Sequence, residues 1–154
     1  IILNSKKINV TKRLSDLLIE RGYGCFEGLQ DNVIQSKYPD IYQKWKENEN
    51  TYIEGAEKIE SVVNRIKTFI KNMVVDEYEN VLAVTHSGVL YALYKFITNT
   101  ELGVRPNEVS FPNCCSVYLY IYHTNKVINK LELHIQDQTY VYCCSPAEMI
   151  VTAT

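Results

Sequence analysis

Apolar side chains recur at helical spacing in several stretches of the chain. The clearest stretch runs from Glu54 to Met73, where apolar residues every three or four positions form one face and charged residues cover the other. A second helix is expected from Tyr38 to Asn48, opened by Pro39, because a proline suits the first helical turn. Val89 to Ile97 predicts a third amphipathic helix, and Ile1 to Lys7 is interpreted as the end of another.

Other stretches have the composition of strands. Val81 to Thr85 is a short, nearly unbroken apolar run, which is typical of a strand buried on both faces. Three later runs are rich in tyrosine and β-branched residues, at 116–122, 127–135 and 139–143, with a hairpin turn expected at 124–126. A buried strand that leads directly into a helix is an α/β unit. The pattern therefore predicts an α/β fold with a mixed sheet and helices on both faces.

Length and composition limit the classes of protein to which this chain can belong. The 154 residues fit one domain, and 46% hydrophobic with 22% charged residues is ordinary for a globular protein. The formal net charge of −2 gives no overall field that would recruit nucleic acid or an anionic membrane. No apolar run reaches the roughly 20 residues that span a bilayer, and no signal peptide is visible. Five cysteines without a C-x-x-C pair indicate reduced, mostly buried thiols, so we expect a cytoplasmic protein.

His86 is the most informative residue for function. It follows the predicted strand at 81–85 and precedes a helix. Ligands of open α/β sheets bind outside the carboxyl ends of strands, and the first turn of a helix attracts anions through its free N–H groups and its dipole. A protonated histidine there would balance the charge of a phosphoryl group. On position alone, a histidine that caps the helix or bonds a backbone carbonyl fits equally well.

A compact run, Glu20-Arg21-Gly22-Tyr23-Gly24, joins an acid, a cation and a phenol. Arginine forms forked hydrogen bonds with phosphate, and a glutamic acid can protonate a leaving oxygen. The alternative for this run is a glycine-rich loop with an ordinary surface ion pair.

Four motifs in one order resemble the histidine phosphatase superfamily of phosphoglycerate mutase-like proteins. These are an L-x-E-x-x-Y/F-G-x-x-E/Q-G segment, a G-G-E-S segment with an arginine eight residues after its acid, a V-S/T-H-G/S-G strand end, and an N-C/A/G-S-like turn. The matching segments here are Leu18–Gly28, Gly55–Lys58 with Arg65, Val84–Gly88 and Asn113–Ser116. The resemblance runs from about residue 1 to 135 and implies a three-layer α/β/α fold with a mixed, mostly parallel sheet, incomplete at the N-terminus.

The resemblance also implies roles for individual residues. Glu20 would donate a proton to the leaving oxygen, and His86 would contact the transferring phosphoryl group. Arg21 and Tyr23 would line the substrate side of the pocket. The remaining substrate-binding positions that the resemblance implies are Ser87, Gly88 and, as a looser match, Asn113.

Three other motif residues are expected to shape the fold. Gly55 and Glu57 would order the long helix and the loop before it. Arg65 fits a structural ion pair at least as well as it fits a ligand, and it is left out of the site.

The nucleophile of this family is a histidine in an R-H-G motif after the first strand, which becomes phosphorylated. None of the three histidines here lies in such a motif, and His123 and His134 are expected to be solvated or at the edge of the core. A second phosphate-clamping arginine, in an S-x-x-x-R-A-x-x-T-A segment, has no match either. We therefore expect the nucleophilic histidine and this arginine upstream of Ile1, so that residues 1–154 form a single, partial domain. Without the R-H-G strand, we expect the edge of the strand before His86 to be exposed, together with an apolar face.

The resemblance leaves the reaction open. Mutases carry a longer insert with an arginine pair, but residues 30–50 contain no arginine. This favours a phosphomonoester phosphatase that acts on a small phosphorylated metabolite. The alternatives are a phosphomutase, or an inactive protein that binds phosphorylated ligands or inorganic phosphate. The implied chemistry uses histidines and arginines, so no cofactor and no metal are expected.

Overall fold

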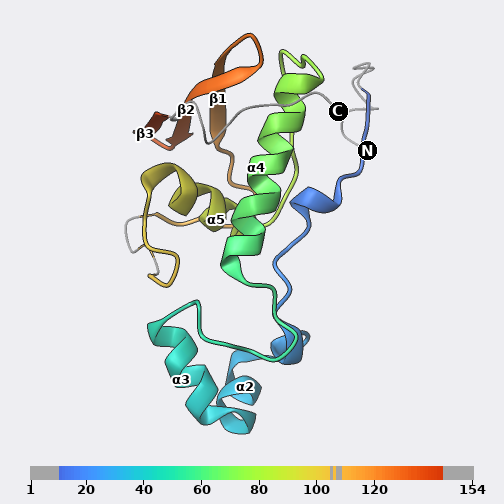
Figure 1. Ribbon diagram of the computed structural model, residues 1–154. Helices are drawn as coiled ribbons and strands as arrows, with labels where there is room; N and C mark the ends of the chain where they lie inside the picture. Colours follow the sequence, from blue (N-terminus) through green and yellow to red (C-terminus); the bar gives the residue numbers. More distant parts are fainter. Residues whose placement is uncertain (1–10, 105, 107–108, 144–154) are drawn as a thin grey trace.

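The computed structural model describes residues 11–104, 106 and 109–143. The predicted helix end at 1–7 lies outside these residues. Two helices, α4 (Ile59–Val75) and α5 (Ser87–Thr98), pack beside a small sheet, while α2 (Asp31–Lys37) and α3 (Pro39–Glu47) form a separate, smaller part (Figure 1). Two 3-10 turns, η1 (Asp16–Leu18) and η2 (Gly24–Phe26), lie between the chain start and α2.

The predicted helices form, with shifted boundaries. Helix α3 begins at Pro39, as expected, and α5 covers the predicted 89–97 stretch. Helix α4 begins at Ile59 rather than at Glu54. The reason is local: Gly55 has a left-handed φ of 75°, and Lys58 is extended, so no helical turn can include them. Helix α2 was not predicted, because its seven residues contain only two apolar side chains.

The sheet is antiparallel, in the order β1-β2-β3, with strands Tyr118–Thr124, Val127–Ile135 and Gln138–Cys143. The predicted hairpin turn is confirmed: Asn125 and Lys126 both have positive φ, 50° and 63°, which suits the twist of a tight hairpin. Leu131 and Leu133 of β2 are fully buried, whereas Tyr118 and Tyr120 of β1 are exposed. One face of the sheet therefore packs on the helices and the other faces solvent.

The structure does not contain the expected mixed, mostly parallel sheet in three layers. The only sheet among the described residues is antiparallel, and Val81–Thr85 is neither paired as a strand nor buried. Leu82 and Val84 are 78% and 84% exposed. A buried parallel strand needs a neighbour on its edge, and no described segment pairs with this one. The segment before His86 is apolar and exposed, as expected, but the prediction that it forms a strand is wrong.

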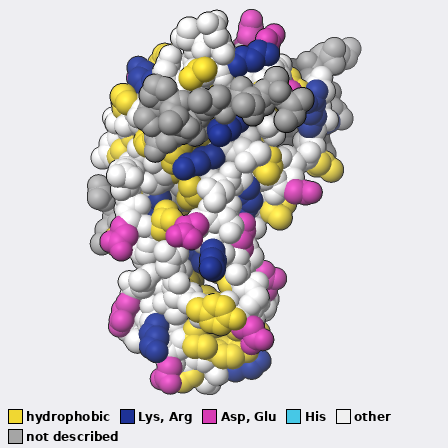
Figure 2. Space-filling model, in the orientation of Figure 1, with side chains coloured by type: hydrophobic (Ala, Val, Ile, Leu, Met, Phe, Trp, Pro, Cys, Tyr) yellow, Lys and Arg dark blue, Asp and Glu magenta, His cyan; other side chains and the backbone are white. Residues whose placement is uncertain are grey.

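Two apolar cores hold the described residues together. The larger core joins α4, α5, the 109–111 segment and β2, and every residue of α5 from Ala92 to Ile97 is buried. The smaller core lies between η2, α2, α3 and the following loop, and its buried members are Phe26, Ile34, Tyr42 and Ile53. In the space-filling view, apolar side chains gather on this smaller part between acidic and basic ones (Figure 2).

The cysteines differ from expectation in their exposure. Cys114, Cys115 and Cys143 are exposed free thiols and Cys25 is half-buried. The prediction of mostly buried thiols is thus wrong for Cys114, Cys115 and Cys143, which lie in a turn and at a strand end, whereas Cys25 lies in η2 and packs against the smaller core. Within the described ranges, no helix combines the length and apolarity needed to cross a bilayer.

Candidate active site

A cavity of about 200 Å³ lies at the start of α5. Three parts of the chain form its walls: Glu20 from the loop after η1, Thr85–Ser87 from the segment entering α5, and Asn113–Cys115 from the turn before β1. The hydroxyl of Thr85 donates to the carbonyl of Leu18 at 2.8 Å and so ties the first two parts together. The cavity thus brings together four of the predicted site residues, Glu20, His86, Ser87 and Asn113.

His86 occupies the N-cap position of α5. Its backbone is extended, and its carbonyl accepts the first helical hydrogen bond, from the N–H of Leu90 at 3.1 Å. The imidazole makes no capping hydrogen bond and is exposed at the cavity. Of the two interpretations of this residue, the structure therefore does not support a side-chain cap. The N–H groups of the first turn, beginning with Ser87, have no partners within the helix and carry the positive end of its dipole.

Glu20 reaches the first turn of α5. Its Oε1 accepts the backbone N–H of Arg21 at 2.9 Å. A Cβ at position 88 would collide with this same oxygen and would lie 3.3 Å from the hydroxyl of Tyr23. Gly88 thus lets the carboxylate and the phenol approach the helix two residues after His86.

The guanidinium of Arg21 is held by backbone carbonyls. The side chain is buried, and its guanidinium donates to the carbonyls of Glu57 at 2.9 Å and Glu49 at 3.2 Å. It also lies over the ring of Tyr23, 5.4 Å from the centroid. Arg21 does not line the 200 Å³ cavity. In this structure its guanidinium holds two loops together, and no forked pair of donors faces the phosphoryl position.

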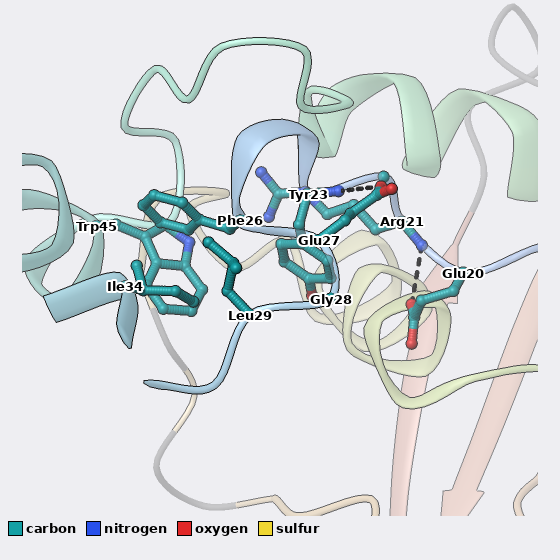
Figure 3. A pocket seen from close by; sticks show the side chains of 10 residues that line it. Glu20, Arg21, Tyr23, Phe26, Glu27, Gly28, Leu29, Ile34 and Trp45 are labelled. Carbon is teal, nitrogen blue, oxygen red and sulfur yellow. Dashed lines mark hydrogen bonds between the residues drawn. The ribbon is translucent and has the colours of Figure 1, made fainter. Parts of the chain in front are cut away.

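A second cavity, of about 440 Å³, adjoins the first and shares Glu20 with it. Figure 3 shows aromatic and aliphatic side chains at one end of this cavity and the Glu20 carboxylate at the other. Tyr23 and Arg21 belong to its lining. All predicted site residues except Gly88 therefore line one of two adjoining cavities, and Glu20 lines both.

Arg65 and Glu57, two further motif residues, make structural contacts. Arg65 forms a two-pronged ion pair with Glu57, at 2.9 and 3.1 Å, and donates to the Leu17 carbonyl at 2.8 Å. The backbone N–H of Glu57 donates to the carbonyl of Gly22 at 2.8 Å. These bonds fix the loop that carries Glu20 against the start of α4.

The two other histidines lie away from the cavities. His123 is exposed, and His134 is half-buried on β2, where its Nδ1 lies 3.1 Å from the Thr139 hydroxyl. This confirms their interpretation as solvated or core-edge residues.

Sequence reasoning missed several walls of the smaller cavity, including Phe111, Pro112 and Cys115. The only signal was their closeness in the chain to Asn113. Among the residues that the structure describes, no three histidine, cysteine, aspartate or glutamate side chains are grouped to hold a metal ion.

Comparisons with known proteins identify the family of the chain. The model of the histidine phosphatase superfamily (branch 1) matches residues 2–134. Phosphoserine phosphatase 1 of Hydrogenobacter thermophilus is 27% identical over 104 residues, which cover 66% of this chain and 48% of that protein. A putative phosphoserine phosphatase 2 of the same organism is 24% identical over 90 residues, which cover 58% and 44%. The chain thus spans about half the length of the curated relatives it matches.

Solved structures show the same fold. A mycobacterial hydrolase superimposes with a TM-score of 0.55 at 22% identity, over 66% of this chain and 53% of the other. A mycobacterial glucosyl-3-phosphoglycerate phosphatase gives 0.53 at 21% identity, over 66% and 52%. With a family match over most of its residues, the chain belongs to branch 1 of the histidine phosphatase superfamily.

Proposed function

We propose that the protein is a phosphomonoester phosphatase that hydrolyses a small phosphorylated metabolite, and that this chain forms part of its single catalytic domain. The observation that carries the proposal is the 200 Å³ cavity, where Glu20 and His86 line one space at the start of a helix. An acid, an imidazole and a helix N-terminus are groups that suit a phosphoryl-transfer site, because they donate a proton and stabilise negative charge.

The proposed reaction has two steps. A histidine outside these 154 residues attacks the phosphorus, the ester bond breaks, and protonated Glu20 gives its proton to the leaving alkoxide. Glu20, now a carboxylate, then takes a proton from water as the water attacks the phosphohistidine, which releases phosphate and restores both residues. Throughout, His86 and the N–H groups of Ser87 and Gly88 stabilise the charge on the phosphoryl oxygens.

Two observations support a phosphatase over a mutase. The relatives named above are phosphatases by name. Residues 30–50, which supply α2, α3 and a wall of the larger cavity, contain no arginine to hold a second anionic group.

Replacing His86 in the whole protein tests the charge-stabilising role. His86→Ala is expected to lower kcat by roughly 10²–10³-fold, the range for losing one donor to a developing anion. Because the imidazole is exposed and caps nothing, thermal stability should stay unchanged. Near wild-type turnover in this variant would refute the role of His86.

Replacing Glu20 tests the proton-donor role. Glu20→Gln should slow hydrolysis of alkyl phosphates far more than that of p-nitrophenyl phosphate, whose leaving group needs little protonation. Glu54→Gln, an exposed acid outside both cavities, is the matched control and should leave both rates unchanged. An equal loss for both substrates in Glu20→Gln would remove this residue from the proton-transfer step.

A further inference from the structure

The 440 Å³ cavity lies where the leaving group of a phosphate ester would extend. Glu20 lines both cavities, so an oxygen that receives its proton lies at the junction between them. With the phosphoryl group in the smaller cavity beside His86, the rest of the substrate would enter the larger one. The chemistry of the larger cavity therefore selects the leaving group.

The walls of the larger cavity are mainly aromatic and aliphatic (Figure 3). Half of its ten lining residues are of these two kinds, namely Tyr23, Phe26, Leu29, Ile34 and Trp45. Its volume falls in the range of about 300–1,000 Å³ that small-molecule sites occupy, and a dry cavity of about 150 Å³ already binds benzene. The space therefore accommodates a ring.

The charges of the cavity oppose an anionic leaving group. Its lining contains two acids, Glu20 and Glu27, and one cation, Arg21, whose guanidinium donates to two backbone carbonyls. Lys46 lies over the outer face of Trp45, but it is not part of the lining, and its ammonium pairs with Asp31 at 3.3 Å. A carboxylate or second phosphate on the leaving group would therefore face acids without a paired cation.

The walls are held in place before any ligand enters. Trp45 meets Phe26 and Tyr23 edge to face, with ring centroids 5.8 and 6.3 Å apart. The loop that carries Tyr23 is fixed by the N–H of Cys25, which donates to the Glu54 carbonyl at 2.9 Å. An apolar ligand would bind there without ordering the side chains first.

We propose that the substrate of this protein is the phosphate ester of an apolar, ring-bearing alcohol, whose ring binds between Leu29 and Trp45 in the 440 Å³ cavity. This inference rests on the phosphatase function proposed above.

Esters of primary alcohols test the inference, because their leaving groups need similar protonation. The whole protein should hydrolyse 2-phenylethyl phosphate with a kcat/KM at least about tenfold above that for phosphoserine or 3-phosphoglycerate, as expected for a ring placed in an apolar pocket. Leu29→Lys places a cation in the lining and should reduce this preference by about tenfold. Val33→Lys makes a similar change on the exposed side of α2, outside the cavity, and should leave the preference intact.

A binding measurement separates the inference from the proposed function. Trp45 is the only tryptophan of these 154 residues and lines the cavity, so the part of the emission that a Trp45→Phe variant of the whole protein lacks reports on the cavity. The product 2-phenylethanol should change this emission saturably, glycerol should not, and Leu29→Lys should weaken the response. Turnover that favours phosphoserine, or an unresponsive Trp45, would overturn the inference alone. Binding of 2-phenylethanol without turnover of any ester would instead refute the phosphatase function on which the inference rests.

Discussion

Gly88 lies at the point where α5 meets the loop that carries Glu20. Any side chain at this position would occupy the space of the Glu20 carboxylate and would approach the Tyr23 hydroxyl. The position lacks a positive φ, so the backbone itself would accept alanine. Glycine is therefore needed at position 88 because of the contact with Glu20, and not because of backbone strain.

Gly88→Ala should separate activity from stability. The added methyl group displaces the carboxylate, so kcat for alkyl phosphates should fall by about tenfold or more. Stability should be unchanged or should rise by up to about 1 kcal/mol, because alanine is the better helix former. Activity assays and thermal unfolding of the whole protein measure the two effects. In a Glu20→Gln background the substitution should cost little more activity, and an additive loss would show that it acts through another residue.

At the level of single residues, the sequence predicted part of the site. Glu20 and His86 were assigned to one pocket from motif positions, and both line the same cavity. Arg21 shows the limit of such reasoning, because the carbonyls it binds belong to Glu57 and Glu49, 36 and 28 positions away. No local pattern indicates which distant carbonyls will capture a guanidinium.

Secondary structure was predictable where neighbours in the chain supply the stabilising contacts. The hairpin β1–β2 and helices α3 and α5 formed close to their expected positions. Val81–Thr85 has the composition of a buried strand, yet it is unpaired and exposed. A strand depends on hydrogen bonds to another segment, and composition does not reveal whether that segment is present.

The exposed face of the sheet carries a polar cluster centred on Glu132 of β2. Its carboxylate pairs with Lys130 at 2.7 Å and accepts the Tyr122 hydroxyl at 2.8 Å. The hydrogen bond from Lys130, and then that from Tyr122, lowers the pKa of Glu132 below its usual value. The ionised Glu132 carboxylate therefore contributes fully to the free energy of unfolding above the usual glutamate pKa. This contribution is lost as the pH falls through the lowered pKa of Glu132.

Glu132→Gln should make stability less dependent on pH in the acid range. Urea unfolding at neutral pH and below the usual glutamate pKa measures the difference. The wild-type protein should lose more stability between the two conditions than Glu132→Gln does. Lys130→Met should also lose less stability than the wild type between these conditions. An identical loss of unfolding free energy at acid pH in the wild type and in Glu132→Gln would show that the cluster contributes nothing to stability.

The two parts of the molecule meet at a buried ion pair. Lys95 of α5 is 1% exposed, and its ammonium pairs with Glu49, beyond α3, and donates to the Leu102 carbonyl at 2.9 Å. The backbone of Glu49 takes part as well, because its carbonyl accepts Arg21 and its N–H donates to Gly103. The α2–α3 part, which contributes Ile34 and Trp45 to the larger cavity, is thereby joined to the helix that begins at the smaller cavity.

Lys95→Ala should destabilise the protein by about 3–5 kcal/mol, the usual result of removing one partner of a buried ion pair. Lys44→Ala, on the exposed side of α3, is the control and should change stability by less than about 0.5 kcal/mol. Urea unfolding gives both values. A small effect in Lys95→Ala would show that the two parts are held together elsewhere.

The assignment of the whole molecule depends on an anion site that His86 and Glu20 share. Soaking crystals of the whole protein with vanadate, a phosphate mimic, tests this most directly. The account predicts one vanadate in the 200 Å³ cavity, within hydrogen-bond distance of the His86 imidazole and the Ser87 N–H, with the Glu20 carboxyl group facing one of its oxygens. An empty cavity at saturating vanadate, or vanadate bound out of reach of His86, would contradict it.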